Sequence, residues 1–266
     1  MRTYFAVFRM RFIAAFQYRI VAFSSMTTSL VWGFMSILAY AAFYRVNPDA
    51  FPMTFPQTVS YVWINQTFLL WFAVVFTDGD IESTLESGSI AYELARPADL
   101  YWRWFTRACA GRVAMSVLRL PALAAAFLLP GILKMTLPPD LIRLLLFVLS
   151  MVLALFVTVS FTMLMYVTMF HTISFRGIRL TVTAVTTFLS GGLIPLPFFP
   201  ASIRGIVEAL PFAAMQNIPL RIYNGNITGI DVIYGIGFQV FWLVTLIILG
   251  KLAMGYSLRK VVAQGG

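Results

Sequence analysis

The stretch from Leu144 to Phe170, LLLFVLSMVLALFVTVSFTMLMYVTMF, contains no charged residue. A bilayer core about 30 Å thick requires about 20 apolar residues as a helix, so this stretch is long enough to cross it. Four further charge-free stretches occur at 20–44, 50–77, 180–203 and 232–250, and a stretch interrupted by two arginines occurs at about 108–131. The sequence therefore predicts an all-α integral membrane protein with six transmembrane helices, forming a single transmembrane domain over residues 1–266.

The composition of the chain agrees with this class. Of the 266 residues, 60% are hydrophobic and 11% are charged, whereas a soluble domain carries about 25% charged residues. The net charge of +9 is explained by basic residues beside the spans, so no nucleic-acid partner is expected. The single cysteine, Cys109, excludes an internal disulfide, and no metal site is predicted.

The positions of the basic residues predict the orientation. Six spans put both termini on one side of the bilayer, and that side also holds the loops after the second and fourth spans. Most of the 19 basic residues lie there. Because basic residues accumulate in cytoplasmic loops, we predict a multi-pass protein of the cell membrane with both termini in the cytoplasm.

The first 19 residues are predicted to form an amphipathic helix. Aromatic residues recur at spacings of three or four, at Tyr4, Phe5, Phe8, Phe12 and Phe16. This spacing is typical of an amphipathic helix that lies at the inner membrane interface. A helical extension of the first span is the alternative.

The loop over residues 78–100 is the strongly acidic part of the chain. Its residues 78–97 hold half of the ten acidic residues, together with a sparse apolar set of Ile81, Leu85, Ile90 and Leu94. Gly79, Gly88 and Pro97 are expected to bound short helical pieces. A solvated connector would not need ordered apolar residues, so we favour a docking element for a cytoplasmic partner and keep the connector as the alternative.

The third span carries Arg112 and Arg119, about two turns apart. An arginine inside a bilayer costs roughly 2.5–3.5 kcal/mol on insertion scales, so both side chains should face protein or a wet cavity. For Arg119 three roles stay open. It can bind an anionic group of a substrate, it can snorkel towards the membrane interface, or it can pair with a backbone carbonyl within the bundle.

The far end of the fifth span combines helix-breaking residues. Ser190-Gly191-Gly192 precedes Pro195-Leu196-Pro197 and then Phe198-Phe199-Pro200. Broken backbone at membrane depth is tolerated only where protein buries it or where it lines a wet cavity. Residues 195–230 are therefore predicted as a re-entrant segment with one or two short amphipathic helices before the last span.

Sequence motifs for catalysis are absent. The chain has no GxxxxGK sequence followed by Ser or Thr, no HExxH and no GxSxG elbow with a histidine partner. We therefore expect no enzyme activity and no cofactor bound by this chain. Any ATP and Mg would be held by another subunit.

The order of these elements resembles the type-two ABC exporter permeases, in particular the small stand-alone permeases whose ATPase is a separate polypeptide. The residues that carry the resemblance are Ile81–Ile90 followed by Leu94-Ala95-Arg96-Pro97, Leu189–Pro195, Phe198-Phe199-Pro200, Leu210-Pro211-Phe212 and Pro219–Gly225. The resemblance covers essentially the whole chain.

The resemblance implies a dimer of permeases, identical or related, seated on a cytoplasmic ABC ATPase dimer. It implies that the 78–97 loop is the coupling helix, through Ile81, Glu82, Leu85, Glu86, Gly88, Ile90, Glu93, Leu94, Arg96 and Pro97. It assigns the translocation path and outer gate to Arg119, Ser190, Gly191, Gly192, Pro195, Pro197, Phe198, Pro211 and Phe212. The cargo is then an amphiphilic drug, peptide or lipid that leaves the cytoplasm.

Two other classes of function stay open at this point. A membrane-embedded lipid-modifying enzyme would need an essential loop carboxylate and no ATPase partner. A non-transporting assembly subunit would tolerate bulky replacements at Gly191, Gly192 and Pro195.

Overall fold

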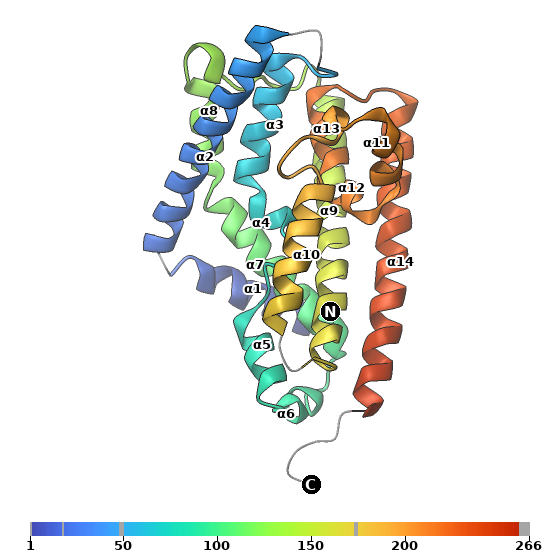
Figure 1. Cartoon of the computed structure of the whole chain (residues 1–266). Coiled ribbons are helices and arrows are strands. Elements are labelled where there is room, and N and C mark those ends of the chain that lie inside the picture. The colour runs from blue at the N-terminus through green and yellow to red at the C-terminus, as the bar shows by residue number, and fades with distance from the viewer. Residues whose placement is uncertain (1, 18, 48–50, 173–174, 261–266) are drawn as a thin grey trace.

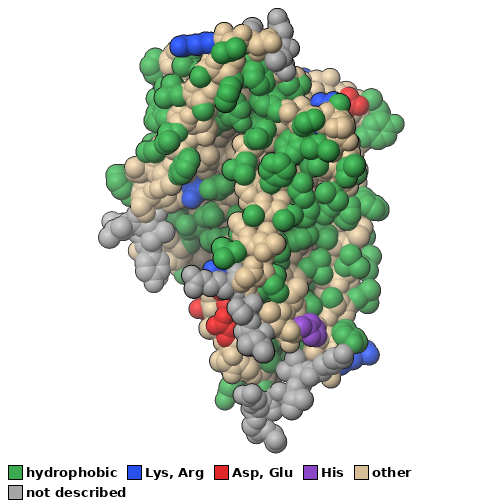
Figure 2. Space-filling model, in the orientation of Figure 1, with side chains coloured by type: hydrophobic (Ala, Val, Ile, Leu, Met, Phe, Trp, Pro, Cys, Tyr) green, Lys and Arg blue, Asp and Glu red, His purple; other side chains and the backbone are tan. Residues whose placement is uncertain are grey.

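The computed structural model describes residues 2–17, 19–47, 51–172 and 175–260. Within these ranges the regular structure is entirely helical, which confirms the all-α prediction. The longest helices are α2 (Arg19–Val46), α9 (Leu141–Met169) and α14 (Ile230–Lys260), and α9 and α14 run side by side (Figure 1). Hydrophobic side chains cover much of the middle of the face in Figure 2, and most of the charged ones lie towards its two ends.

Helices long and apolar enough to cross a membrane account for four of the six predicted spans in the described part of the chain. They are Phe23–Val46, Leu100–Leu128, Leu141–Met169 and Ile230–Arg259. The fifth predicted span contains a shorter helix, α10 (Phe175–Leu189). The second is divided into α3 (Phe55–Thr67) and α4 (Leu69–Phe72), after which the backbone leaves the helix. The arrangement of six spans stays a prediction.

The helix α9 lies at the centre of the bundle. It packs against α14, α7 (Leu100–Val117), α12 (Pro211–Met215) and α13 (Asn217–Asn224). Small polar side chains on α9 have no exposed surface, namely those of Ser150, Thr158, Ser160 and Thr162. Small residues let neighbouring helices approach closely, which explains why this apolar stretch is also the most buried of the candidate spans.

The third predicted span begins earlier than expected and is bent. Its helix α7 starts at Leu100, where the Asp99 carboxylate accepts a hydrogen bond of 3.0 Å from the Trp102 amide. The prediction had placed the start near Ala108 because arginines interrupt the preceding residues. The helix breaks after Val117 and resumes as α8 (Leu120–Leu128), because Pro121 has no amide hydrogen to continue the ladder.

The N-terminal helix α1 (Arg2–Ala15) is separate from α2 and packs against α7, so it is not an extension of the first span (Figure 1). The aromatic residues of α1 do not form one buried face. Phe8 packs against the core, whereas Phe5 is 71% exposed. Of the predicted residues 1–19, Met1 and Tyr18 lie outside the described part of the chain.

Short helices gather at the two ends of the bundle. At the lower end in Figure 1 lie α5 (Gly79–Glu86) and α6 (Ile90–Leu94). At the upper end lie α11 (Ala201–Ala209), α12 and α13, which is one more short helix than the sequence predicted. Most side chains of α12 and α13 are buried against α9, α3 and α14, so this segment turns back into the bundle.

Candidate functional site

The first candidate site is the 78–97 segment, which contains α5 and α6. The Asp78 side chain caps α5 by accepting a hydrogen bond of 3.0 Å from the Asp80 amide. Gly88 has a φ of +68° and turns the chain between the two helices, a conformation that glycine adopts without strain. Ile81 and Ile90 are 2% and 3% exposed, so these two predicted coupling residues lie in the core and anchor the segment.

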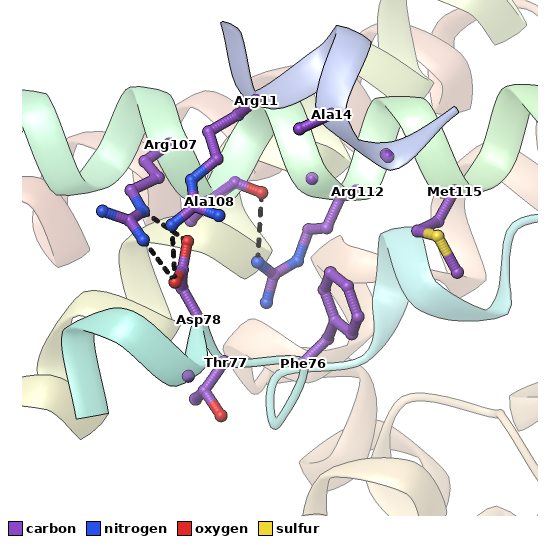
Figure 3. Close-up of a pocket in the computed structure, with 12 residues that line it drawn as sticks. Arg11, Ala14, Phe76, Thr77, Asp78, Arg107, Ala108, Arg112 and Met115 are labelled. Atoms are coloured by element: carbon purple, nitrogen blue, oxygen red, sulfur yellow. Dashed lines mark hydrogen bonds and ion pairs between the residues drawn. The ribbon is translucent and has the colours of Figure 1, made fainter. Parts of the chain in front are cut away.

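Acidic residues of the 78–97 segment bind arginines of α1 and α7. The Asp78 carboxylate lies 2.5 Å from Nε of Arg107 and 3.2 Å from Nη2 of Arg11. Asp80 pairs with the same two arginines. Figure 3 shows Arg11 and Arg107 converging on Asp78 from different helices. Burial raises the pKa of the Asp78 carboxyl, and the positive charge of Arg11 opposes that rise.

Two further ion pairs extend this attachment. Glu82 lies 3.2 Å from Nη1 of Arg179 on α10, and Glu93 lies 2.6 Å from Nη2 of Arg103 on α7. The sequence favoured a docking role for this loop as a whole, which stays a prediction. The structure turns four of its five acids, Asp78, Asp80, Glu82 and Glu93, towards arginines of the same chain.

Of these four acids Asp80 remains exposed, and the rest of the exposed face of the 78–97 segment consists of other residues. Leu94 is 46% exposed, and Tyr92 is 79% exposed. Glu86, Gly88, Arg96 and Pro97 are exposed as well, whereas Leu85 is partly buried against the core. Tyr92 was missed by the sequence analysis. The signal for it was an aromatic residue next to Glu93 in an acidic loop.

A cavity of about 270 Å³ lies between α1, α7 and the chain leading into α5 (Figure 3). Arg112 lies at its edge and is fully buried. Its Nη2 donates to the Ala73 carbonyl at 3.0 Å and to Oγ1 of Thr162 at 2.8 Å. The backbone after α4 leaves carbonyls without helical partners, and Arg112 satisfies them from inside the protein.

The second arginine of this span lies at the bend between α7 and α8. Nε of Arg119 donates to Oγ of Ser25 at 2.5 Å, and Nη1 donates to the Gln66 carbonyl at 3.3 Å. The residue is 7% exposed. Of the three roles that the sequence left open, pairing with a backbone carbonyl is therefore present, and a role in a substrate path stays a prediction.

The second candidate site is the break after α10, together with the side chains that satisfy it, which we call the 190–216 network. The Tyr61 hydroxyl donates to the Gly191 carbonyl at 3.0 Å, and Nδ2 of Asn65 donates to the Gly192 carbonyl at 3.1 Å. Nε2 of Gln216 donates to Oδ1 of Asn65 at 3.0 Å. Gly191 adopts a φ of +89°. The sequence analysis missed Tyr61, Asn65 and Gln216, although polar amides inside apolar stretches were a visible signal.

The other predicted gate residues lie around this network. Ser190, Pro195, Pro197 and Pro211 are buried, and Phe198 and Phe212 are partly buried. A groove of about 450 Å³ runs beside them, between α2 and residues 193–198, with aromatic walls that include Tyr40, Phe43 and Phe198. Arg119 is not among the residues that line this groove.

The comparisons with known proteins point to one family. A family model described as an ABC-2 family transporter protein matches residues 30–265, which include the 78–97 segment and the 190–216 network. Comparison with curated proteins and with solved structures gave no match.

Proposed function

The chain belongs to the ABC-2 family of transporter proteins, and we propose that it is the permease subunit of an ATP-driven exporter whose ATPase is a separate polypeptide. The family match agrees with the resemblance that the order of motifs suggested. It also agrees with a multi-pass membrane protein that acts in transport. Export of an amphiphilic cargo and the pairing of two permeases are the further parts of the proposal.

The observation that carries the proposal is the attachment of the 78–97 segment. Ion pairs bind it to α1, α7 and α10, while Tyr92 and Leu94 remain exposed. A permease without its own phosphate loop must receive mechanical work through a docking surface. Because ion pairs hold this segment to three helices, a force that an ATPase applies to the segment would displace those helices as well.

The proposed route of transmission runs along α10. Glu82 on α5 pairs with Arg179 near the start of α10, and α10 ends at the 190–216 network. Movement of α5 by an ATPase would therefore displace the helix whose far end is held by Tyr61, Asn65 and Gln216. In this proposal the network acts as the outer gate.

The cargo and the second permease are assigned to the groove beside α2. Its walls are apolar and aromatic, which suits an amphiphilic drug, peptide or lipid. On the same helix Trp32, Met35 and Phe43 are 56%, 57% and 60% exposed. We propose that a second permease, identical or related, faces this side of α2, and that the cargo passes between the two.

The experiment that tests the proposal is purification of the tagged chain from its native membrane in mild detergent, with mass spectrometry of the bound proteins. We expect a stoichiometric ATPase. Leu94→Asp should lower its retention at least tenfold, because a charge in an apolar contact costs more than about 1.4 kcal/mol. The matched control is Leu137→Asp in the loop between α8 and α9, where the leucine is 74% exposed. A chain that purifies without an ATPase would overturn the proposal.

A further inference from the structure

A second cavity, of about 250 Å³, lies on the other flank of α1, between this helix, the end of α6 and the start of α7. Among the described residues, four arginines line it, Arg11, Arg96, Arg103 and Arg107, and Glu93 is the one carboxylate in the lining. Arg11 and Arg107 also pair with Asp78 and Asp80 outside the cavity. Arg96 and Arg103 therefore share the single carboxylate of Glu93, so the lining has an excess of positive charge.

The burial and hydrogen bonding of Arg103 also bear on what this cavity binds. Arg103 is 4% exposed, and its Nη2 donates to the Glu93 backbone carbonyl at 2.7 Å and pairs with the Glu93 carboxylate. Its Nε and Nη1 have no hydrogen-bond partner among the described residues. Buried donors without acceptors are costly, and guanidinium donors are more so than neutral ones. Arg103 is one of the residues that line the cavity, so an anion bound there would offset its charge.

We propose that this cavity binds a phosphate group, supplied by an anionic phospholipid of the bilayer. Guanidinium groups match the geometry of phosphate oxygens through paired N–H donors. The remaining wall contains Val7, Met10 and Trp104, which suits the apolar part of a lipid next to its headgroup.

The opposite face of α1 supports a lipid as the source of the phosphate. Phe5 and Ile13 on that face are 71% and 49% exposed, and Arg9 is exposed between them. Exposed apolar and basic residues on one helix are typical of a helix that lies in the headgroup region. A lipid phosphate beside α1 would then join this helix to α6 and α7. The proposal concerns a lipid that stays bound, and it does not depend on the exporter function.

The test measures lipid binding to the purified full-length chain in dodecyl maltoside by native mass spectrometry. The probes are dihexanoylphosphatidylglycerol, dihexanoylphosphatidylcholine and inorganic phosphate as a competitor. We expect phosphatidylglycerol to bind more tightly than phosphatidylcholine. Arg96→Gln should weaken the binding of phosphatidylglycerol about fivefold, the size expected for one partly exposed charge contact. Arg103→Gln should weaken it further.

Two controls keep the test decisive. Arg9→Gln removes the same charge from the exposed face of α1 and should leave binding unchanged. Arg103→Gln leaves Glu93 with a weaker partner and can impair folding, whereas the Arg96 side chain is 62% exposed and its replacement should not. Displacement of phosphatidylglycerol by equimolar inorganic phosphate would overturn the assignment to a lipid and leave a free-phosphate site. Equal binding by the wild type, Arg96→Gln and Arg9→Gln would overturn the phosphate site itself.

Discussion

The 78–97 segment and the 190–216 network are both irregular parts of a helical bundle, but they are stabilised by different chemistry. Around the 78–97 segment, carboxylates bind arginines, and several of these groups are partly exposed. In the 190–216 network, a phenol and two amides bind backbone carbonyls, and all three side chains are almost fully buried.

The difference follows from where each region lies in the fold. Charged groups need water or a strong partner, and burial of an unpaired charge is far more costly than burial of an amide. The 78–97 segment lies at an end of the bundle, where Asp80 still reaches solvent. The 190–216 network lies inside the protein, so neutral donors satisfy the carbonyls that the break after α10 exposes.

The largest effect should come from Gly191→Ala. Gly191 has a φ of +89°, and an added Cβ would lie 2.7 Å from the Tyr61 hydroxyl. Backbone strain together with the lost hydrogen bond should cost about 4 kcal/mol. Thermal unfolding in detergent measures this. Gly205→Ala on α11 is the control, because no atom lies within 4 Å of the added Cβ. Equal thermal unfolding midpoints for Gly191→Ala and Gly205→Ala would show that the chain around Gly191 is not tightly packed.

The next largest effect should come from Ile81→Ala in the 78–97 segment. Ile81 is 2% exposed, and truncation of a buried isoleucine should lower the free energy of unfolding by about 3 kcal/mol. The measurement is unfolding by SDS titration, followed by circular dichroism. A change below about 0.5 kcal/mol would mean that ion pairs alone attach this segment.

A smaller effect on stability should distinguish the ion pairs of the 78–97 segment from the neutral hydrogen bonds of the 190–216 network. Double-mutant cycles on Asp78 with Arg107, and on Asn65 with Gln216, should each give a coupling energy of about 1–1.5 kcal/mol. The Asp78–Arg107 coupling should weaken in 1 M salt, where the Debye length falls to about 3 Å, because Arg107 is partly exposed. The Asn65–Gln216 coupling should not change. A similar salt response in both cycles would contradict the comparison.

The smallest effect on stability should come from Tyr92→Ala. The side chain is 79% exposed, so the free energy of unfolding should change by less than about 0.5 kcal/mol. Under the proposed function the same variant should retain less ATPase in the purification experiment. If the Tyr92→Ala variant is stable and binds the ATPase as the wild type does, Tyr92 is not part of the docking face. The Leu94→Asp variant would still test whether that face binds the ATPase.

Several parts of the fold followed from local sequence signals. The stretches that became α2, α9 and α14 are long, apolar and free of charge through most of their length, so hydropathy alone located them. The glycines and prolines after α10 located the break, because these residues disrupt helices wherever they stand. The start of α7 was placed about eight residues late, because the arginines that pair with Glu93 and Asp78 look like loop residues in a sequence.

Length, hydropathy and helix-breaking residues act locally, so they identify this chain as a helical membrane protein with an acidic loop and a broken helix. The tertiary structure sets which way the acids face. Asp78 meets Arg107 across 29 residues, and Glu82 meets Arg179 across 97. It also decided that Tyr61, Asn65 and Gln216 would meet at the break, since their partners lie 130, 127 and 151 residues away. Such pairings depend on how the helices pack, and no local pattern encodes the packing.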